Sequence, residues 1–261
     1  MRIQSLDRAI RILDLFRNTR DPIGISEMAA SLDLAKTTVH GLVSTLEKNG
    51  FLLKDTRIRK YRLGFALYEL GSIQVADLEV NQRAFLPLRQ LANVTNMICR
   101  VGIWDRNAVI VTMTAQPQGH ESTTRQIGPR LPGYCTALGK AVLANMPDSE
   151  IEDYLDEIEL IAYTPNTITD RKDLEEDLVR TREQGYSISR AEILPHQIGL
   201  GAPVLNAGGR VIGSISASLN AEDLETDVLN TTAGHLMRTA HQISLDTGYQ
   251  PMEMNKRLTQ R

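Results

Sequence analysis

Few residues of this chain have the types and spacing that catalysis requires. The pair Gly139-Lys140 looks like a fragment of a phosphate-binding loop, but Tyr134 and Ala141 stand where that loop needs glycine and serine or threonine. The run Gly213–Ser216 lacks the second glycine of a Gly-x-Ser-x-Gly nucleophile elbow. We therefore predict no catalytic residue, and we expect that the protein is not an enzyme.

Potential metal ligands are equally sparse. His235 and His241 lie six positions apart, so they do not share a helix face as a metal-binding pair four apart would. Cys99 and Cys135 form no Cys-x-x-Cys pattern and are expected to behave as small buried side chains. No metal and no other cofactor is predicted. A nucleophilic Cys135 with a distant histidine stays open, although nothing local supports it.

The side chains best suited to chemistry could hydrogen-bond nucleic acid, and they gather on one predicted helix over residues 36–49. Its apolar residues recur at helical spacing and would face inward: Val39, Leu42, Val43 and Leu46. The opposite face carries short polar side chains that could reach base edges in a major groove. The candidate DNA contacts there are Lys36, Thr37, Thr38, His40, Gly41 and Ser44. Taken alone, the pattern also fits an ordinary amphipathic helix.

A basic hairpin is predicted directly after that helix. Residues 51–54 and 60–63 alternate between apolar and polar types, as strands do, and residues 55–59 would form the turn. Such a hairpin beside a helix-turn-helix is a wing, which contacts phosphates or the minor groove. The candidate DNA contacts in it are Arg57, Arg59, Lys60 and Tyr61.

Two earlier helices must position these groups. Ser5 is the expected cap of a first helix with apolar residues at helical spacing, from Leu6 to Phe16. Ser26, also a candidate DNA contact, is expected to cap a short second helix. Residues 33–35 would form the tight turn before the third helix. This order predicts a winged helix-turn-helix domain over residues 1–64.

The charge distribution supports this division. Residues 1–70 carry 12 Lys/Arg and 8 Asp/Glu, a balance of +4, whereas the whole chain has 29 and 32, a balance of −3, which leaves −7 for the remainder. A basic head on an acidic body fits a protein whose N-terminal part alone meets phosphate. No apolar run is long enough for a secretory signal or a membrane helix, so we expect a cytoplasmic protein.

The rest of the chain predicts a helical connector and an α+β body. Residues 65–80 contain no proline and are expected to form one helix. In the body, over residues 81–250, we expect helices over 83–94, 136–146, 170–184 and 222–245, and strands over 97–104, 108–115, 121–127, 186–192, 201–205 and 210–219. Antiparallel hairpins with helices packed on them indicate the α+β class. Residues 251–261 are expected to be a disordered tail.

A ligand pocket in the body is a further expectation. Ser216 and Ser218 lie two apart on a predicted strand, so they face the same side of the sheet and could line a pocket. The same spacing also fits a sheet face that simply meets a helix. Arg100, Arg125 and Arg190 are candidate partners for a carboxylate, whose geometry a guanidinium matches, but each also fits a surface charge.

Several ordered segments of the chain resemble the IclR family of bacterial regulators. In the first part they are Ser5–Leu13, Ile25–Ala29, Leu34–His40, Leu46–Phe51 and Tyr61–Gly64, which are similar to the family's N-terminal domain. In the body they are Gly128–Pro132, Thr136–Ala141, Gly185-Tyr186, Ala202–Val204 and Ser214–Ser218, which are similar to its GAF-like effector-binding domain. One departure is Gly41, where the family often has arginine, and it removes a potential base or phosphate contact.

The resemblance implies a repressor that binds a partly palindromic operator as a homodimer or homotetramer, with dimer contacts from the connector. It also implies an effector site lined by Cys135, Thr136, Ala137, Leu138, Ser189, Gly199, Ser216 and Ser218. The helix start at Thr136 would favour an anion. Ser189 and Gly199 replace an acid and a cysteine of the member that senses small oxo acids. We therefore expect a small catabolic metabolite, with a carboxylate as its first candidate group.

Two other classes of protein stay open on the residues alone. A metabolic enzyme with an appended winged helix would need a catalytic constellation, which we do not find. A winged helix that binds proteins instead of DNA would not need the cations of the hairpin. Neutralising those cations therefore distinguishes the DNA-binding prediction from the second alternative.

Overall fold

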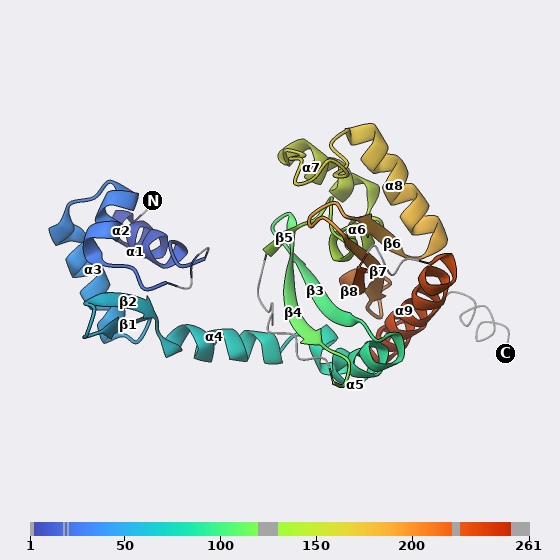
Figure 1. The fold of residues 1–261 in the computed structure, drawn as a ribbon, viewed down its shortest axis with the longest axis horizontal. Coiled ribbons are helices and arrows are strands. Elements are labelled where there is room, and N and C mark those ends of the chain that lie inside the picture. Colours follow the sequence, from blue (N-terminus) through green and yellow to red (C-terminus); the bar gives the residue numbers. More distant parts are fainter. Residues whose placement is uncertain (1–2, 18, 20, 120–129, 221–224, 252–261) are drawn as a thin grey trace. The chain divides into compact units, whose positions relative to one another are not determined.

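The computed structural model describes residues 3–17, 19, 21–119, 130–220 and 225–251 (Figure 1). The chain divides into two compact units, Met1–Asp77 and Leu78–Arg261. The strand expected over 121–127, the candidate Arg125 and residues 252–261 of the expected tail lie outside the described residues. Each unit has its own apolar core and is described by itself.

The first unit contains the predicted helix-turn-helix. Helices α1 (Gln4–Asp14), α2 (Ile25–Leu32) and α3 (Lys36–Lys48) follow in order. Between α2 and α3, Asp33 takes a left-handed conformation with φ 52°, which reverses the chain in three residues. The inward apolar residues of the three helices meet in one core that includes Ile12, Met28, Val39 and Val43.

Two predicted helix caps are wrong. The N-cap of α1 is Ile3, and Ser5 lies inside the helix. The N-cap of α2 is Gly24, and Ser26 likewise lies inside. The backbone N–H of Gly24 donates to Glu27 Oε2 at 2.6 Å, so Glu27 makes the half of a capping box in which a first-turn glutamate accepts from the N-cap residue.

The wing follows as an antiparallel pair, β1 (Leu52–Asp55) and β2 (Lys60–Leu63). Tyr61 extends it by exchanging backbone hydrogen bonds with Ile23, at 3.0 and 2.9 Å. Helix α4 (Phe65–Ala76) starts at the end of β2. A Cβ atom on Gly64 would collide with the Gly50 carbonyl, so a glycine is needed where the wing passes the end of α3.

The predicted connector helix is interrupted. Helix α4 ends at Ala76, and α5 (Glu79–Thr95) begins after Leu78, whose backbone is extended with ψ 111°. Leu78 is the N-cap of α5, and Val80, two residues later, is buried in the core of the second unit.

The second unit is built on a six-stranded antiparallel sheet. Its strands are β3 (Ile98–Asp105), β4 (Ala108–Ala115), β5 (Arg130–Pro132), β6 (Ser187–Arg190), β7 (Gln197–Leu205) and β8 (Val211–Asn220). Their order in the sheet is β5-β4-β3-β8-β7-β6. Strand β8 therefore pairs with β3, far from it in sequence, and places Ser216 opposite Arg100.

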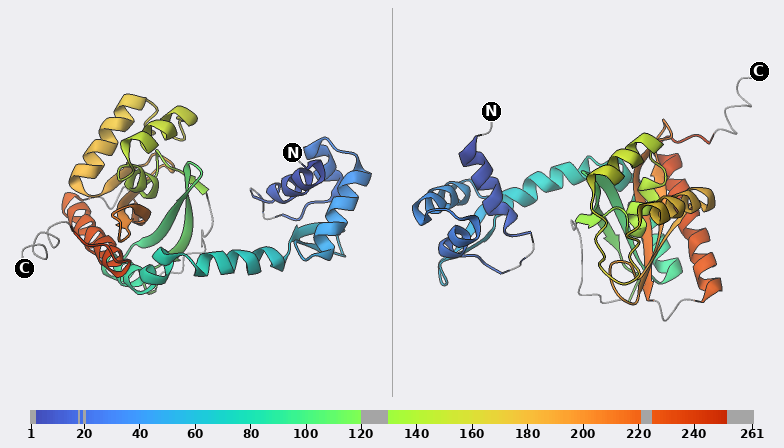
Figure 2. Two further views of the ribbon diagram at one scale, coloured as in Figure 1. Left: turned by 180° about the vertical axis from the view of Figure 1, so that it is seen from behind. Right: turned by 90° about the horizontal axis from the view of Figure 1, so that it is seen from above.

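Helices cover both faces of this sheet, as Figures 1 and 2 show. Helices α5 and α9 (Thr226–Asp246) pack on one face, over a core that includes Leu88, Leu200 and Leu236. Helix α6 (Ala137–Leu143) lies on the other face, backed by α7 (Asp148–Glu157) and α8 (Arg171–Gln184). The α+β prediction is confirmed. Helix α7 and strand β5 were not predicted.

Candidate nucleic-acid interface and ligand pocket

The polar face of α3 is exposed. Val39 and Val43 are fully buried, while five candidate contacts on the other side of the helix are exposed: Lys36, Thr37, His40, Gly41 and Ser44. Thr38 is half-buried. Ser26 on α2 is also exposed. Most of the candidate contacts of α3 therefore lie on a single outward surface. They lie there because the helical spacing that turns the two valines inward places these residues on the opposite side of the helix.

Gly41 has no structural need to be glycine. A Cβ atom at this position would meet no atom within 4 Å. Its carbonyl accepts a hydrogen bond from the Thr45 hydroxyl at 3.0 Å. Position 41 therefore lies on the outer face of α3 with open space beside it.

The turn of the wing presents two arginines. Asp55 Oδ1 accepts hydrogen bonds from the N–H groups of Arg57 at 3.0 Å and Ile58 at 3.4 Å, which fixes the loop. Arg59 has a positive φ of 54°. The side chains of Arg57 and Arg59 are exposed, and no described carboxylate forms an ion pair with either of them.

Lys60 has a different environment from the two arginines. Its Nζ lies 2.7 Å from Glu27 Oε1, so it ties the wing to the start of α2. This hydrogen bond to Lys60, together with the bond from Gly24, lowers the pKa of the Glu27 carboxyl. Lys60 is therefore a cation of the wing that also forms an ion pair with Glu27 within the domain.

Tyr61 is a core residue. Its side chain is only 3% exposed and packs with the apolar side chains of the three helices. The alternation of β2 turns Tyr61 inward and its neighbours outward. This burial corrects the expectation that Tyr61 contacts DNA, and we remove it from the candidate set.

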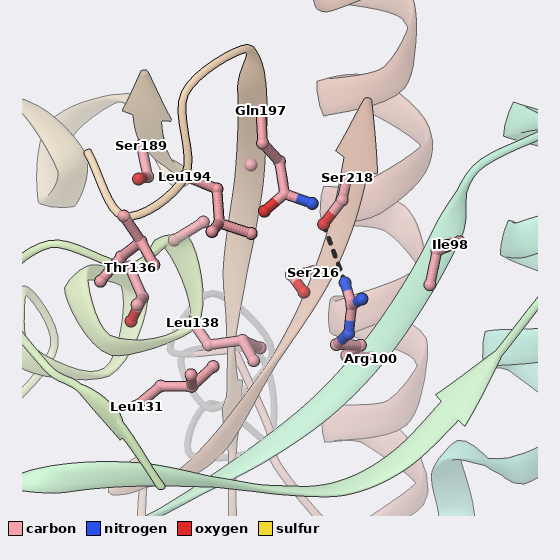
Figure 3. A pocket seen from close by; sticks show the side chains of 13 residues that line it. Ile98, Arg100, Leu131, Thr136, Leu138, Ser189, Leu194, Gln197, Ser216 and Ser218 are labelled. Carbon is pink, nitrogen blue, oxygen red and sulfur yellow. Dashed lines mark hydrogen bonds between the residues drawn. The ribbon is translucent and has the colours of Figure 1, made fainter. Parts of the chain in front are cut away.

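The second unit contains a cavity of about 450 Å³ between α6 and the sheet (Figure 3). Most of the residues that we predicted for the effector site line this cavity. They are Thr136, Ala137, Leu138, Ser189, Gly199, Ser216 and Ser218. They come from the start of α6 and from β6, β7 and β8, which are adjacent strands of the sheet.

Sequence reasoning did not identify six other residues of the lining as pocket residues. These are Ile98, Arg100, Leu131, Ile193, Leu194 and Gln197. Arg100 was considered as a carboxylate partner, but its place in the pocket follows from the pairing of β3 with β8, which has no local signal. Ile193, Leu194 and Gln197 lie at or near the loop between β6 and β7.

Helix α6 is held on the sheet by serine hydroxyls. Ser189 donates to the Cys135 carbonyl at 2.8 Å, Ser187 to the Ala137 carbonyl at 2.6 Å, and Ser214 to the Leu138 carbonyl at 2.8 Å. The Thr136 hydroxyl accepts from the Gly139 N–H at 3.1 Å and so caps the helix itself. We expected an anion to bind at the N–H groups of this helix start. The Thr136 hydroxyl already accepts a hydrogen bond from one of those groups.

Cys135 does not line the cavity, contrary to expectation. Its side chain is fully buried in a cluster formed with α7 and α8 residues. Burial, followed by the nearby Glu192, raises the pKa of its thiol to about 12. A thiol with this pKa stays protonated at neutral pH, so the position is unsuited to a nucleophile. Its contribution to the pocket is the carbonyl that holds Ser189.

Arg100 points into the cavity from β3. Its Nη1 donates to Ser218 Oγ at 3.0 Å (Figure 3). Burial lowers the pKa of its guanidinium, because removal from water disfavours the charged form. An arginine nevertheless stays charged at neutral pH.

A buried ion cluster lies behind α6. Lys140 is 1% exposed, and its Nζ lies 2.6 Å from Glu192 Oε1 and 2.9 Å from Asp177 Oδ2. Burial raises the pKa of Glu192, while Lys140 opposes that rise. The cluster joins α6, α8 and the loop that carries Ile193 and Leu194, so it anchors two sides of the cavity.

Other kinds of site find no support in the part of the chain that the structure describes. Within those residues, no group of three or more His, Cys, Asp or Glu side chains could hold a metal ion. No helix among them is long and apolar enough to cross a membrane.

Comparison with known proteins identifies relatives of both units. Residues 5–56 match the model of the IclR helix-turn-helix domain, and residues 73–245 match that of the bacterial transcriptional regulator IclR C-terminal domain. The HTH-type transcriptional regulator XynR of Escherichia coli is 30% identical over 247 residues, covering 95% of this chain and 98% of XynR. The regulator KdgR of the same organism is 27% identical, covering 95% and 94%.

A solved structure extends the similarity to the fold. The IclR transcriptional regulator from Alicyclobacillus acidocaldarius superposes with a TM-score of 0.83 at 29% identity, covering 95% of this chain and 100% of that one. The match spans both the helix-turn-helix and the α+β body.

Proposed function

The chain belongs to the IclR family of bacterial transcriptional regulators, and from this premise we propose how its own residues bind DNA and a small effector. As a member of the family it is a DNA-binding transcriptional regulator with a C-terminal effector-binding domain. We assign the operator contacts to the exposed face of α3 and to the turn of the wing. The assigned residues are Ser26, Lys36, Thr37, Thr38, His40, Gly41, Ser44, Arg57, Arg59 and Lys60.

The observation that carries this assignment is the pair of exposed arginines in the turn of the wing. Arg57 and Arg59 form no ion pair with any described carboxylate, and the loop that holds them is fixed by Asp55. Cations held in this way beside a recognition helix are suited to phosphate contacts, while the short polar side chains of α3 are suited to base edges.

We assign effector binding to the cavity between α6 and the sheet. The effector would change DNA binding by binding more tightly to one arrangement of the regulator than to another. We propose a small catabolic metabolite that bears a carboxylate, and we propose repression as the outcome of DNA binding. The protein would act in the cytoplasm without catalysing a reaction.

We propose that the regulator acts as a homodimer or as a homotetramer on a partly palindromic operator. Two recognition helices would then lie roughly 34 Å apart, one turn of the DNA helix, or a multiple of that distance. Helix α4 has no buried residue, and Phe65 and Tyr68 on it are more than 70% exposed. A second copy of α4 is the partner that would cover them.

The test is to remove the wing arginines together. Arg57→Ala/Arg59→Ala should weaken binding to DNA from the promoter of the protein's own gene by at least roughly tenfold at low salt. The slope of log K against log salt should fall in magnitude by about two for each bound subunit, and so by about four for a dimer, because each lost phosphate contact releases about one counterion fewer. The measurement is fluorescence anisotropy over a salt series.

The matched control is Arg106→Ala/Lys172→Ala in the second unit. Arg106 resembles Arg59 in being exposed and having a positive φ, here 44°, and Lys172 is an exposed cation of α8. This control should bind as the wild type does. If the wing variant kept its affinity and salt slope, a winged helix that binds proteins would replace our assignment.

A further inference from the structure

Arg100 is the single charged side chain among the described residues that line the cavity. It extends from β3, where its backbone lies opposite Ser216 of β8. One of its five N–H donors is used by Ser218, a neutral acceptor. No described carboxylate forms an ion pair with Arg100, so the cavity carries a net positive charge within the part of the chain that is described.

This arrangement is costly for a protein unless an anion binds there. A charged group that is largely removed from water loses hydration, and it regains that energy only from a counter-charge with good hydrogen bonds. The surroundings of Lys140 show the usual solution, since two carboxylates of this chain pair with that buried cation. Arg100 lacks such a described partner, and its free donors face a cavity.

The remainder of the lining restricts what the anion can be. Ser216 and Gln197 lie near Arg100, whereas Leu131, Leu138 and Leu194 form an apolar wall (Figure 3). A molecule bound here would have its charge at the Arg100 end and its apolar part against the leucines. A second anionic group would find no second cation among the described lining residues.

Arg100 is the one of the three candidate arginines that is a described lining residue of this cavity. Arg190 is exposed and lines a different hollow, together with Lys140 and Asp177. Arg125 lies outside the described residues. Among the described residues, the positive charge of the pocket therefore comes from Arg100.

We propose that Arg100 is the specificity-determining residue of the pocket: it pairs with the single carboxylate of a small monocarboxylic acid whose body packs against Leu131, Leu138 and Leu194. Ser218 holds the guanidinium in place through the hydrogen bond it already makes. The cavity of about 450 Å³ lies within the range of small-molecule sites, so it has room for such an acid. This inference rests on the proposed function of the cavity as the effector site.

The test compares acids with their uncharged amides. Benzoate, 4-methylpentanoate and pyruvate, each beside its primary amide, would be titrated at millimolar concentration into the full-length protein, with binding followed by calorimetry and by the shift in Tm. We expect at least one acid to bind the wild type and its amide to bind at least roughly tenfold more weakly, since a charge-assisted hydrogen bond is stronger than a neutral one.

Two variants locate the effect. Arg100→Met keeps much of the side-chain volume and should weaken binding of that acid by roughly tenfold to a hundredfold. Arg100→Gln removes the charge but keeps a side chain that can donate hydrogen bonds, and it should lose the preference for the acid over the amide. The control is Arg190→Met, which removes an exposed charge outside the cavity and should bind the acid as the wild type does.

Three results would overturn the inference: none of the acids binds the wild type, an amide binds as tightly as its acid, or both Arg100 variants, shown to be folded by their Tm, retain the acid. Failure of the proposed function gives a different result. The acid would then bind through Arg100 but leave promoter affinity in the anisotropy assay unchanged, so the cavity would not be the effector site while the assignment of Arg100 would stand.

Discussion

At the scale of single residues, the two most buried cations among the described residues of the second unit have different surroundings. Lys140 is neutralised by Glu192 and Asp177 at hydrogen-bonding distance. Arg100 meets only the hydroxyl of Ser218 among the described residues. Because Lys140 is satisfied within the protein, we assign it a structural role, and because Arg100 is not, we assign it a binding role.

The structural role of Lys140 gives a prediction about stability. Lys140→Met should lower the free energy of unfolding by about 3–5 kcal/mol, because it leaves the buried carboxylate of Glu192 without its counter-charge. The measurement is urea denaturation followed by circular dichroism.

Lys172→Met, at an exposed position of α8, is the control and should stay within about 0.5 kcal/mol of the wild type. Adding Glu192→Gln to Lys140→Met should recover part of the loss, since the unpaired charge is then removed as well. Equal stability of Lys140→Met and the wild type would contradict the structural role.

At the scale of elements, α3 combines an inward face that the fold requires with an outward face that the fold leaves free. Val39 and Val43 must stay apolar because they are fully buried. Gly41 has empty space on its outer side, so almost any side chain fits there. DNA binding can therefore change at position 41 without changing the core.

This freedom predicts the effect of a cation at position 41. Gly41→Arg should increase affinity for promoter DNA and steepen the salt slope by about one for each bound subunit, and so by about two for a dimer, through one added phosphate contact per subunit. It should also stabilise the first unit by up to about 1 kcal/mol, because glycine is a poor helix former. Both effects are measured by anisotropy over a salt series and by thermal unfolding.

Gly41→Ala separates the two effects. It should share the gain in stability and leave the salt slope unchanged, since alanine adds no charge. If Gly41→Arg bound DNA with an unchanged slope, the outer face of α3 would not lie against the phosphate backbone.

At the scale of the whole molecule, we propose that α4 provides the surface through which two copies of the regulator assemble. Phe65 and Tyr68 lie three residues apart, so they share one side of the helix, and both are more than 70% exposed. Two large aromatic side chains on one exposed helix face favour contact with another protein surface.

The prediction is that Phe65→Ser/Tyr68→Ser weakens the dimer. Sedimentation velocity over a dilution series should show monomer at concentrations where the wild type is a dimer, and promoter affinity should fall because one half-site no longer supports the other. Val179→Ser, which removes a half-exposed apolar side chain from α8, is the control and should leave the dimer intact. A wild-type protein that sediments as a monomer would refute the assignment.

The sequence by itself determined the features that depend on near neighbours in the chain. The spacing of Val39 and Val43 oriented α3, and the alternation of residues 51–54 and 60–63 indicated the wing, because helix and strand periodicity are local properties. Ordered motifs also indicated the family. The same local reading included Tyr61 among the DNA contacts, although its place in the alternation turns it toward the core.

The tertiary structure alone decided which side chains share the pocket. Arg100 and Ser218 are 118 positions apart and meet because β3 pairs with β8. Leu194 and Gln197 join them because β7 lies beside β8, and Cys135 is excluded because α6 turns it toward α7 and α8. Strand order follows from packing over the whole unit, which no local pattern encodes. Whether Arg100 was a surface charge or part of the pocket therefore became clear only from the fold.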